Sequence, residues 1–243
     1  MRIERKCGFY EKYVKRCLDI ICSLLFIIFF SWLYLIIAVT VRIKMGSPVF
    51  FKQPRPGLVK NGKETIFDMY KFRTMTDDRN PDGEWLPDEE RLSKFGAMLR
   101  STSLDELPEV FCILRGTMSV VGPRPQLVRD MAFMSDEQRM RHTAKPGLTG
   151  LAQVNGRNIV TWEEKLNWDL KYIDHVNFWD DVKILFATIA VVFKRSGITD
   201  GENATALDYG DALLKAGKIS KAEYDSKMAH ARILIEDHEK RKR

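Results

Sequence analysis

The chain has 243 residues, with 39 Lys and Arg against 33 Asp and Glu, a formal net charge of +6 and a pI of about 9.1. This length allows one sizeable soluble domain beside a short membrane segment, and the positive charge suits anionic lipid, phosphorylated substrates or nucleic acid. The spacing of the four cysteines (Cys7, Cys17, Cys22 and Cys112) excludes a disulfide framework or a zinc site and indicates a reduced, cytoplasmic protein.

The first predicted element is a membrane helix, because an uncharged apolar run extends from Ile20 to Val41. Such a helix is about 33 Å long, against a hydrocarbon core of about 30 Å. Basic residues flank both ends: Lys12, Lys15 and Arg16 precede the run, and Arg42, Lys44, Lys52 and Arg55 follow it. Basic flanks favour the cytoplasmic side, so a re-entrant helix satisfies both ends, whereas a signal anchor that spans once leaves one end outside.

Two strands are predicted next, at residues 48–53 and 64–74, as a small β-hairpin. Alternation along the second strand places Lys71 and Arg73 on one face, where two cations can bind phosphate. A solvated edge strand, protected from aggregation by its lysine, is the alternative. The stretch between the strands is rich in turn residues (Pro54, Pro56, Gly57, Asn61 and Gly62), and a loop over 76–87 and a helix over 88–99 follow.

Asp105 and Glu106 form an adjacent pair of carboxylates, with Arg100 before the pair and Arg124 after it. Carboxylates beside guanidinium groups suit a site that grips a phosphate and holds a metal ion while one carboxylate attacks. The alternative is structural, because Ser103 and Glu106 have the spacing of a capping box at a helix start. Acidic residues in a first helical turn also stabilise the helix dipole.

The helix that follows this pair is predicted to end near Gly116, and a stiff bend then surrounds Arg124. Proline on both sides fixes the backbone, so that Arg124 is presented in one direction. Further small and polar residues lie in turn-rich segments that suit a nucleotide pocket, although ordinary connectors have the same composition. The candidate substrate-loop residues are Pro123, Pro125, Gly147, Thr149, Gln153, Asn155 and Arg157.

The rest of the chain is predicted to be helical. Thr161 and Glu164 form a capping box that opens one helix. Residues 181–195 carry an apolar stripe at helical spacing, which predicts an amphipathic helix that packs in the core or lies at the membrane interface. Residues 204–243 look like a helical hairpin divided at Gly217.

Six motifs stand in order along the chain: Lys15-Arg16-x-x-Asp19; Pro48-Val49-Phe50-Phe51-x-Gln53-x-Arg55; Tyr70-Lys71-Phe72-Arg73-Thr74-Met75; Leu99-Arg100-x-x-Ser103-Leu104-Asp105-Glu106-Leu107-Pro108; Val121-Gly122-Pro123-Arg124-Pro125; and Lys145-Pro146-Gly147-x-Thr149-Gly150. With the membrane segment, they resemble the bacterial polyprenyl-phosphate phosphoglycosyl transferases of the small monotopic class. The resemblance covers roughly residues 10 to 200. Six ordered motifs are a specific signal, whereas a lone Asp-Glu pair is not.

The resemblance implies a chemistry. Members of this family move a sugar-1-phosphate from a nucleotide sugar, usually a UDP-sugar, onto undecaprenyl phosphate. Asp105 matches the family's nucleophile, which forms an aspartyl phosphosugar and releases UMP, and Glu106 matches the residue that binds Mg²⁺. Lys71, Arg100 and Arg124 match positions around the phosphates, and Arg73 is a further candidate. Mg²⁺ and guanidinium groups offset the repulsion between a carboxylate and a diphosphate.

The expected fold is α+β and mostly helical, with a re-entrant membrane helix, a small β-hairpin, amphipathic interfacial helices and a cytoplasmic catalytic domain. The expected divisions are 1–45 (basic segment and membrane helix), 46–203 (transferase domain) and 204–243 (helical hairpin). The expected partners are a UDP-sugar, undecaprenyl phosphate and lipid of the bacterial inner membrane, without nucleic acid, and a homodimer is left open.

Two features bear on the details of this expectation. Family members usually carry Ser-Pro midway along the membrane segment, whereas this chain has Ser31-Trp32 as its candidate hinge, and tryptophan does not force a bend. The stretch from Arg195 to Thr205 looks like the tail of members that use UDP-linked N-acetylated amino sugars, including the N,N′-diacetylbacillosamine phosphate transferase. A UDP-hexose such as UDP-galactose is the alternative donor.

Two other classes of protein compete with a transferase. A membrane-anchored binding protein would spread basic and aromatic residues along one face, whereas here the cations stand singly within Pro/Gly-framed motifs. A membrane adaptor would act through its C-terminal hairpin. Deletion of residues 206–243 separates these hypotheses, because an adaptor loses all function and a transferase keeps some turnover.

The basic flanks predict that residues 1–15 and the domain after Lys44 lie on the same, cytoplasmic side of the membrane. Single cysteines at Glu4 and Lys60, in a background without the four native cysteines, should both resist a membrane-impermeant thiol reagent on intact cells. Both should react after lysis, which is the control for accessibility. Labelling of the cysteine at position 4 alone from outside would show a true span and contradict the re-entrant helix.

Overall fold

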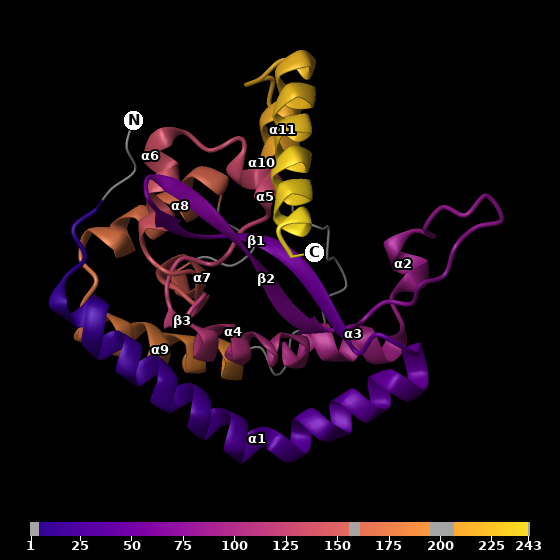
Figure 1. Ribbon diagram of the computed structural model, residues 1–243, viewed down its shortest axis with the longest axis horizontal. Helices are drawn as coiled ribbons and strands as arrows, with labels where there is room; N and C mark the ends of the chain where they lie inside the picture. Colours follow the sequence, from indigo (N-terminus) through magenta and orange to yellow (C-terminus); the bar gives the residue numbers. More distant parts are fainter. Residues whose placement is uncertain (1–4, 156–160, 195–206, 243) are drawn as a thin grey trace. The chain divides into compact units, whose positions relative to one another are not determined.

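The computed structural model describes residues 5–155, 161–194 and 207–242 (Figure 1). These residues are mostly helical, with two small two-stranded sheets. The chain forms two compact units that interleave along the sequence. The first unit contains Met1–Leu18, Pro54–Phe67 and Thr117–Arg243, and the second contains Asp19–Gln53 and Asp68–Gly116.

The apolar run forms one long helix, α1 (Lys15–Met45), after a single π-helical turn, η1 (Tyr10–Val14). The helix is long and apolar enough to cross a membrane. It continues without interruption through the candidate hinge at Ser31 and Trp32, and Figure 1 shows it bent near its middle. The Ser31 hydroxyl donates to the Ile28 carbonyl at 3.0 Å, and such back-bonding by serine often bends helices.

The β-hairpin consists of β1 (Phe50–Lys60) and β2 (Lys63–Phe72). Its turn is only Asn61-Gly62, where both residues have positive φ (52° and 73°). The prediction of a turn-rich stretch from Pro54 onward was therefore wrong. Each strand of a two-stranded sheet has one unpaired edge, and proline is tolerated in a strand where its missing N–H faces that edge.

The second unit continues with α2 (Asp88–Arg91), α3 (Lys94–Ser101), the 3₁₀ turn η2 (Leu104–Glu106) and α4 (Glu109–Arg115). The single helix predicted over 88–99 is divided, because the Ser93 side chain accepts the Gly96 N–H at 2.9 Å and starts a new helix. Gly116 ends α4 in the left-handed conformation, as predicted. The core of this unit joins one face of α1 to the hairpin and α3 through Ile37, Val41, Phe72 and Leu99.

The first unit contains a parallel pair of short strands, β3 (Ser119–Val121) and β4 (Gly147–Thr149), in the register Ser119↔Gly147 and Val121↔Thr149. Its helical elements are α5 (Val128–Met131), α6 (Asp136–Arg139), η3 (Met140–Thr143), α7 (Leu151–Asn155), α8 (Trp162–Asp174), α9 (Phe178–Lys194), α10 (Tyr209–Lys215) and α11 (Lys221–Lys240). The capping box predicted at Thr161 is confirmed. The amphipathic helix starts three residues earlier than the predicted Asp181, at Phe178.

Candidate active site

Asp105 lies in η2, and its side chain is buried although it carries a carboxylate (8% exposed). Burial raises the pKa of Asp105, and the adjacent Glu106 raises it further, while Lys71 and Arg100 lower it. The net direction is upward. Buried acids with shifted pKa values and specific charged neighbours are concentrated at functional sites.

The structure does not contain the capping box that was the alternative interpretation of this turn. Ser103 adopts the left-handed conformation (φ 57°), and its side chain does not cap η2. The Glu106 carboxylate instead accepts a hydrogen bond from the Lys71 ammonium at 2.7 Å. The alternative interpretation of Ser103 as part of a capping box is therefore wrong, and α4 begins only at Glu109. Three residues lie between Asp105 and Glu109, so α4 does not start at the carboxylate pair.

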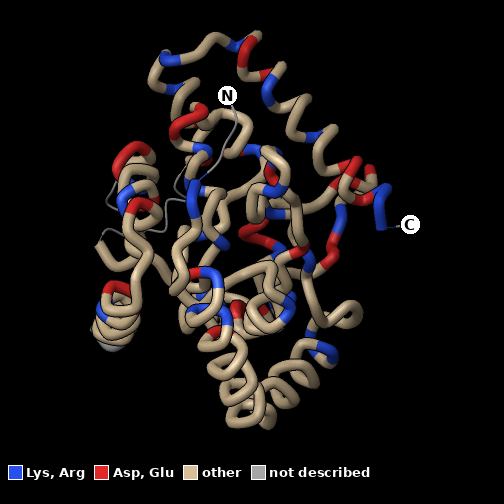
Figure 2. Tube along the Cα trace, turned by 60° about the vertical axis from the view of Figure 1, so that its left-hand side comes forward, with Lys and Arg blue, Asp and Glu red and all other residues tan. Residues whose placement is uncertain are grey.

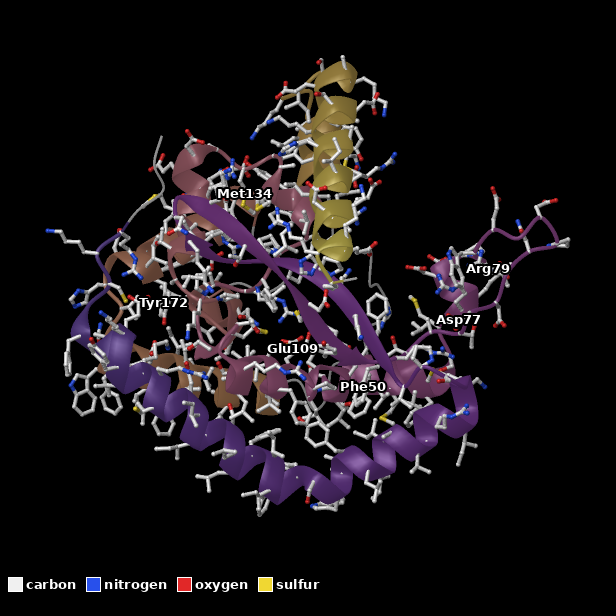
Figure 3. The ribbon with its side chains drawn as sticks, in the orientation of Figure 1. Phe50, Asp77, Arg79, Glu109, Met134 and Tyr172 are labelled. Atoms are coloured by element: carbon white, nitrogen blue, oxygen red, sulfur yellow. The ribbon has the colours of Figure 1, made fainter. Side chains whose placement is uncertain are left out.

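Lys71 joins two carboxylates. Its ammonium nitrogen lies 2.7 Å from Glu106 Oε1 and 3.5 Å from Glu109 Oε1. Glu109, labelled in Figure 3, is almost completely buried at the start of α4 (2% exposed). Glu109 was not predicted as a site residue from the sequence. Its spacing of three residues from Glu106, which can bring two side chains to one helical face, was the available signal.

Tyr34 of α1 is a second residue that the sequence analysis missed. Its hydroxyl donates to the Leu107 carbonyl, two residues after Asp105. Its ring packs near Phe72 and Phe111, with centroid distances of 6.0 and 5.6 Å. A tyrosine within an apolar run has no sequence signal that distinguishes this contact from simple membrane burial.

Two predicted phosphate-binding arginines of this unit contact polar groups of the protein. Arg100 Nε donates to Thr74 Oγ1 at 3.0 Å. Arg73 is buried, and its Nη1 donates to the Ser47 carbonyl at 2.9 Å and to Asp77 at 2.8 Å. Arg73 therefore links the end of the hairpin to the chain before β1 and to the following loop.

Arg124 belongs to the first unit and is half-buried between two buried prolines, Pro123 and Pro125. Its carbonyl accepts a hydrogen bond from Arg141 Nη2 at 2.5 Å. Arg141 is itself buried and pairs with Asp169 at 2.7 Å. The backbone of the Arg124 segment is therefore held by a buried ion pair.

The other substrate-loop candidates of this unit have structural partners. A Cβ added to Gly147 would lie 2.1 Å from Gly122 N, so only glycine fits there. The Thr149 and Thr188 hydroxyls lie 2.6 Å apart. Gln153 Nε2 donates to the Leu148 carbonyl at 3.2 Å, and Asn155 Nδ2 to the Leu151 carbonyl at 2.9 Å. Arg157 and the stretch Arg195–Thr205 lie outside the described residues.

The predicted site residues therefore form two sets, one in each unit of the chain. The second unit brings together Lys71, Glu106 and Glu109, with Asp105 in the same turn as Glu106. Among the described residues, no group of three or more His, Cys, Asp or Glu side chains is arranged to hold a metal ion. Mg²⁺ commonly binds one or two carboxylates together with substrate phosphates and water. Glu106 fits that kind of site, in which a phosphorylated substrate completes the coordination.

Residues 10–195 match the family model described as bacterial sugar transferase. The chain is 45% identical over 193 residues to "Uncharacterized sugar transferase EpsL" of Bacillus subtilis, which covers 79% of this chain and 94% of that relative. It is 36% identical over 206 residues to the undecaprenyl-phosphate galactose phosphotransferase of Salmonella typhimurium, which covers 77% and 42% of the two chains.

A third relative is the UDP-glucose:undecaprenyl-phosphate glucose-1-phosphate transferase of Klebsiella pneumoniae. It is 41% identical over 185 residues, which cover 72% of this chain and 39% of that relative. The chain thus spans less than half the length of the Salmonella and Klebsiella relatives that it matches. It spans almost the whole of the Bacillus relative.

The raised pKa of Asp105 predicts how stability depends on pH. An acid whose pKa is higher in the folded state binds its proton more tightly there, so stability falls as pH rises from the ordinary pKa through the folded one. Asp105→Asn should therefore be at least as stable as the unaltered protein at pH 7, and the difference should shrink towards pH 4. Chemical denaturation at several pH values measures this.

Asp225→Asn, at an exposed surface pair, is the matched control and should change stability little at any pH. If Asp105 served only as an acidic residue that stabilises a helix dipole, loss of its charge would instead cost about 0.3–1 kcal/mol at pH 7. Such a loss of stability would contradict the conclusion that the buried charge of Asp105 destabilises the folded protein at pH 7.

Proposed function

The chain belongs to the bacterial sugar transferase family, and we propose that it transfers a sugar-1-phosphate from a UDP-sugar to undecaprenyl phosphate, the first membrane step of glycan assembly. The observation that carries this proposal is the buried Asp105 carboxylate beside Glu106, whose own carboxylate is bonded to Lys71. All three residues lie within residues 10–195, the part of the chain that matches the family.

In the proposed mechanism, Asp105 attacks the phosphorus that carries the sugar. An aspartate–phosphorus bond forms, the diphosphate bond breaks, and UMP leaves with the bridging oxygen. A phosphate oxygen of undecaprenyl phosphate then attacks the same phosphorus, the bond to Asp105 breaks, and the free carboxylate is restored. Burial favours this role, because a poorly solvated carboxylate with a raised pKa is a stronger nucleophile.

Positive charge near the carboxylate must offset its repulsion from the diphosphate. Lys71 and Arg100 both lower the pKa of Asp105, which favours the ionised form that attack requires. We propose that Lys71, Arg100 and Arg124 also bind substrate phosphates, with Arg73 supporting the backbone nearby. Glu106 would hold Mg²⁺, which supplies positive charge to the phosphates and the leaving UMP.

The proposed location is the cytoplasmic face of the bacterial inner membrane. This is supported by the apolar α1, by its basic flanks and by the bend near its middle (Figure 1). Many large apolar side chains of α1 are exposed, including Ile28, Phe29, Trp32 and Leu35, and lipid is the solvent that suits them. A cytoplasmic catalytic domain also matches the location of UDP-sugars.

Two donor classes are supported by different observations. The tail from Arg195 to Thr205 favours a UDP-linked N-acetylated amino sugar. The Salmonella relative is a galactose phosphotransferase and the Klebsiella relative uses UDP-glucose, so a UDP-hexose is the second candidate donor. Both donors use the same phosphate chemistry at Asp105.

The proposed metal role predicts that EDTA stops UMP release and that added Mg²⁺ restores it. Glu106→Gln should raise the Mg²⁺ concentration needed for half-maximal rate by about tenfold or more, or abolish turnover, because it removes the charged oxygen ligand. Glu163→Gln, at an exposed pair with Lys218, is the control and should leave the requirement unchanged. Full activity in chelator would exclude the metal.

The transferase reaction predicts UMP release that depends on undecaprenyl phosphate. Purified protein should be assayed with UDP-glucose, UDP-galactose and UDP-linked N-acetylated amino sugars, and one donor should exceed the others by about tenfold or more in kcat/KM. Without undecaprenyl phosphate, only a burst of at most one UMP per protein is expected, because the first step stops at the covalent intermediate. Absence of lipid-dependent UMP release with every donor would contradict the proposed function.

A further inference from the structure

Two helices follow the part of the chain that matches the family. The match ends at residue 195, whereas α10 and α11 occupy residues 209–240. Figure 1 shows these helices side by side, with α5 next to both, and each of them contacts α5. The helix α5 begins four residues after Arg124, so the added helices contact the element that follows a proposed phosphate-binding residue.

The start of α10 is closely packed. Tyr209 is buried, and its ring stacks on that of Trp162 with centroids 5.1 Å apart. Its hydroxyl lies 3.2 Å from Gln138 Nε2. A Cβ added to Gly210 would lie 2.4 Å from the Phe133 ring, so α10 lies directly against that side chain. These contacts fix α10 to the elements around α5.

Asp130 connects the helical hairpin formed by α10 and α11 to the Arg124 segment. Its Oδ1 accepts the Tyr209 N–H at 3.0 Å, and its Oδ2 accepts the Leu127 N–H at 3.1 Å. The side chain is nearly inaccessible (2% exposed), and burial raises the pKa of this carboxyl. Leu127 is three residues after Arg124, so one buried carboxylate links the backbone of α10 to the chain beside Arg124.

The helix α11 contacts α5 separately from α10. Ala231 of α11 is buried (2% exposed) in a cluster with Val128 and Met131 of α5. Acidic and basic residues both occur along α11 up to the C-terminus (Figure 2). The helix thus has a limited apolar contact surface, and α5 lies against it. A helix as short as α5, with four residues, has little stability of its own and depends on what it packs against.

We propose that the α10–α11 hairpin is a brace that positions Arg124 for binding the substrate diphosphate. The hairpin holds Leu127 through Asp130, and Arg141 holds the Arg124 carbonyl from within the same unit. A fixed arginine loses less freedom when it binds phosphate, so the brace strengthens binding without contacting the ligand. The inference rests on the proposed function, because it assigns Arg124 to the diphosphate.

Ala231→Asp tests the brace, because it inserts a charge between α11 and α5. Ala229→Asp is the matched control: it makes the same change two residues earlier, on an exposed position of the same helix. Hydrogen exchange of the full-length protein should show faster exchange of the Leu127 and Tyr209 amides in Ala231→Asp than in Ala229→Asp. If Ala231→Asp does not fold, Gly210→Ala, which pushes α10 against Phe133, replaces it.

The link to Arg124 is tested by the affinity for UDP, which carries the diphosphate of every donor. Ala231→Asp should weaken UDP binding by about fivefold, a common size of coupling between connected groups, and Ala229→Asp should not. In an Arg124→Ala background, the same change should have less than about a twofold effect, because the braced side chain is already missing. Calorimetric titration of the four proteins completes this cycle.

Equal losses of UDP affinity in the unaltered and Arg124→Ala backgrounds would overturn the inference. The α10–α11 hairpin would then act on overall stability and not through Arg124. Unchanged exchange at Leu127 would overturn it as well. The proposed phosphate role of Arg124 is tested separately by Arg124→Ala alone. If this variant binds UDP as tightly as the unaltered protein, that role is wrong, even if the exchange data support the brace.

Discussion

The Lys71 ammonium bonds Glu106 at 2.7 Å and lies 3.5 Å from Glu109, and the rest of the candidate site depends on this contact. It joins the end of β2 to the turn that carries Asp105 and to the first residue of α4. Without the lysine, three carboxylates would stand close together in a partly buried place. Such like charges repel strongly where water is scarce, so removal of the lysine would strongly destabilise the turn.

The same turn is held from α1. The Tyr34 hydroxyl bonds the Leu107 carbonyl, and Ile37 and Val41 pack with Phe72 and Leu99 in one apolar core. The helix that is proposed to enter the membrane therefore also supports the turn that carries Asp105. One packed unit thus contains both the helix that is proposed to contact lipid and the proposed nucleophile, which suits the proposed reaction with a lipid substrate.

Local patterns predicted much of the fold. The apolar run, the helix end at Gly116 and the capping box at Thr161 each depend on neighbouring residues, and all three are present in the structure. Contacts between distant segments had no such signal. The strand β1 continues through Pro54, which a strand with one unpaired edge can accommodate. Ser103 does not cap the turn, and the Glu106 carboxylate bonds Lys71, which is far away in sequence. Tyr34 was missed for the same reason, whereas Glu109 had a local signal in its spacing from Glu106 that was not used.

Covalent catalysis by Asp105 is the central claim, and its most direct test is the intermediate itself. The protein should be incubated with its UDP-sugar in the absence of undecaprenyl phosphate, quenched and digested, and the peptide that contains Asp105 analysed by mass spectrometry. We expect that peptide to gain the mass of one sugar phosphate, to lose it when undecaprenyl phosphate is added, and to show no gain in Asp105→Asn. Normal turnover by Asp105→Asn, or an adduct on a different residue, would contradict the mechanism.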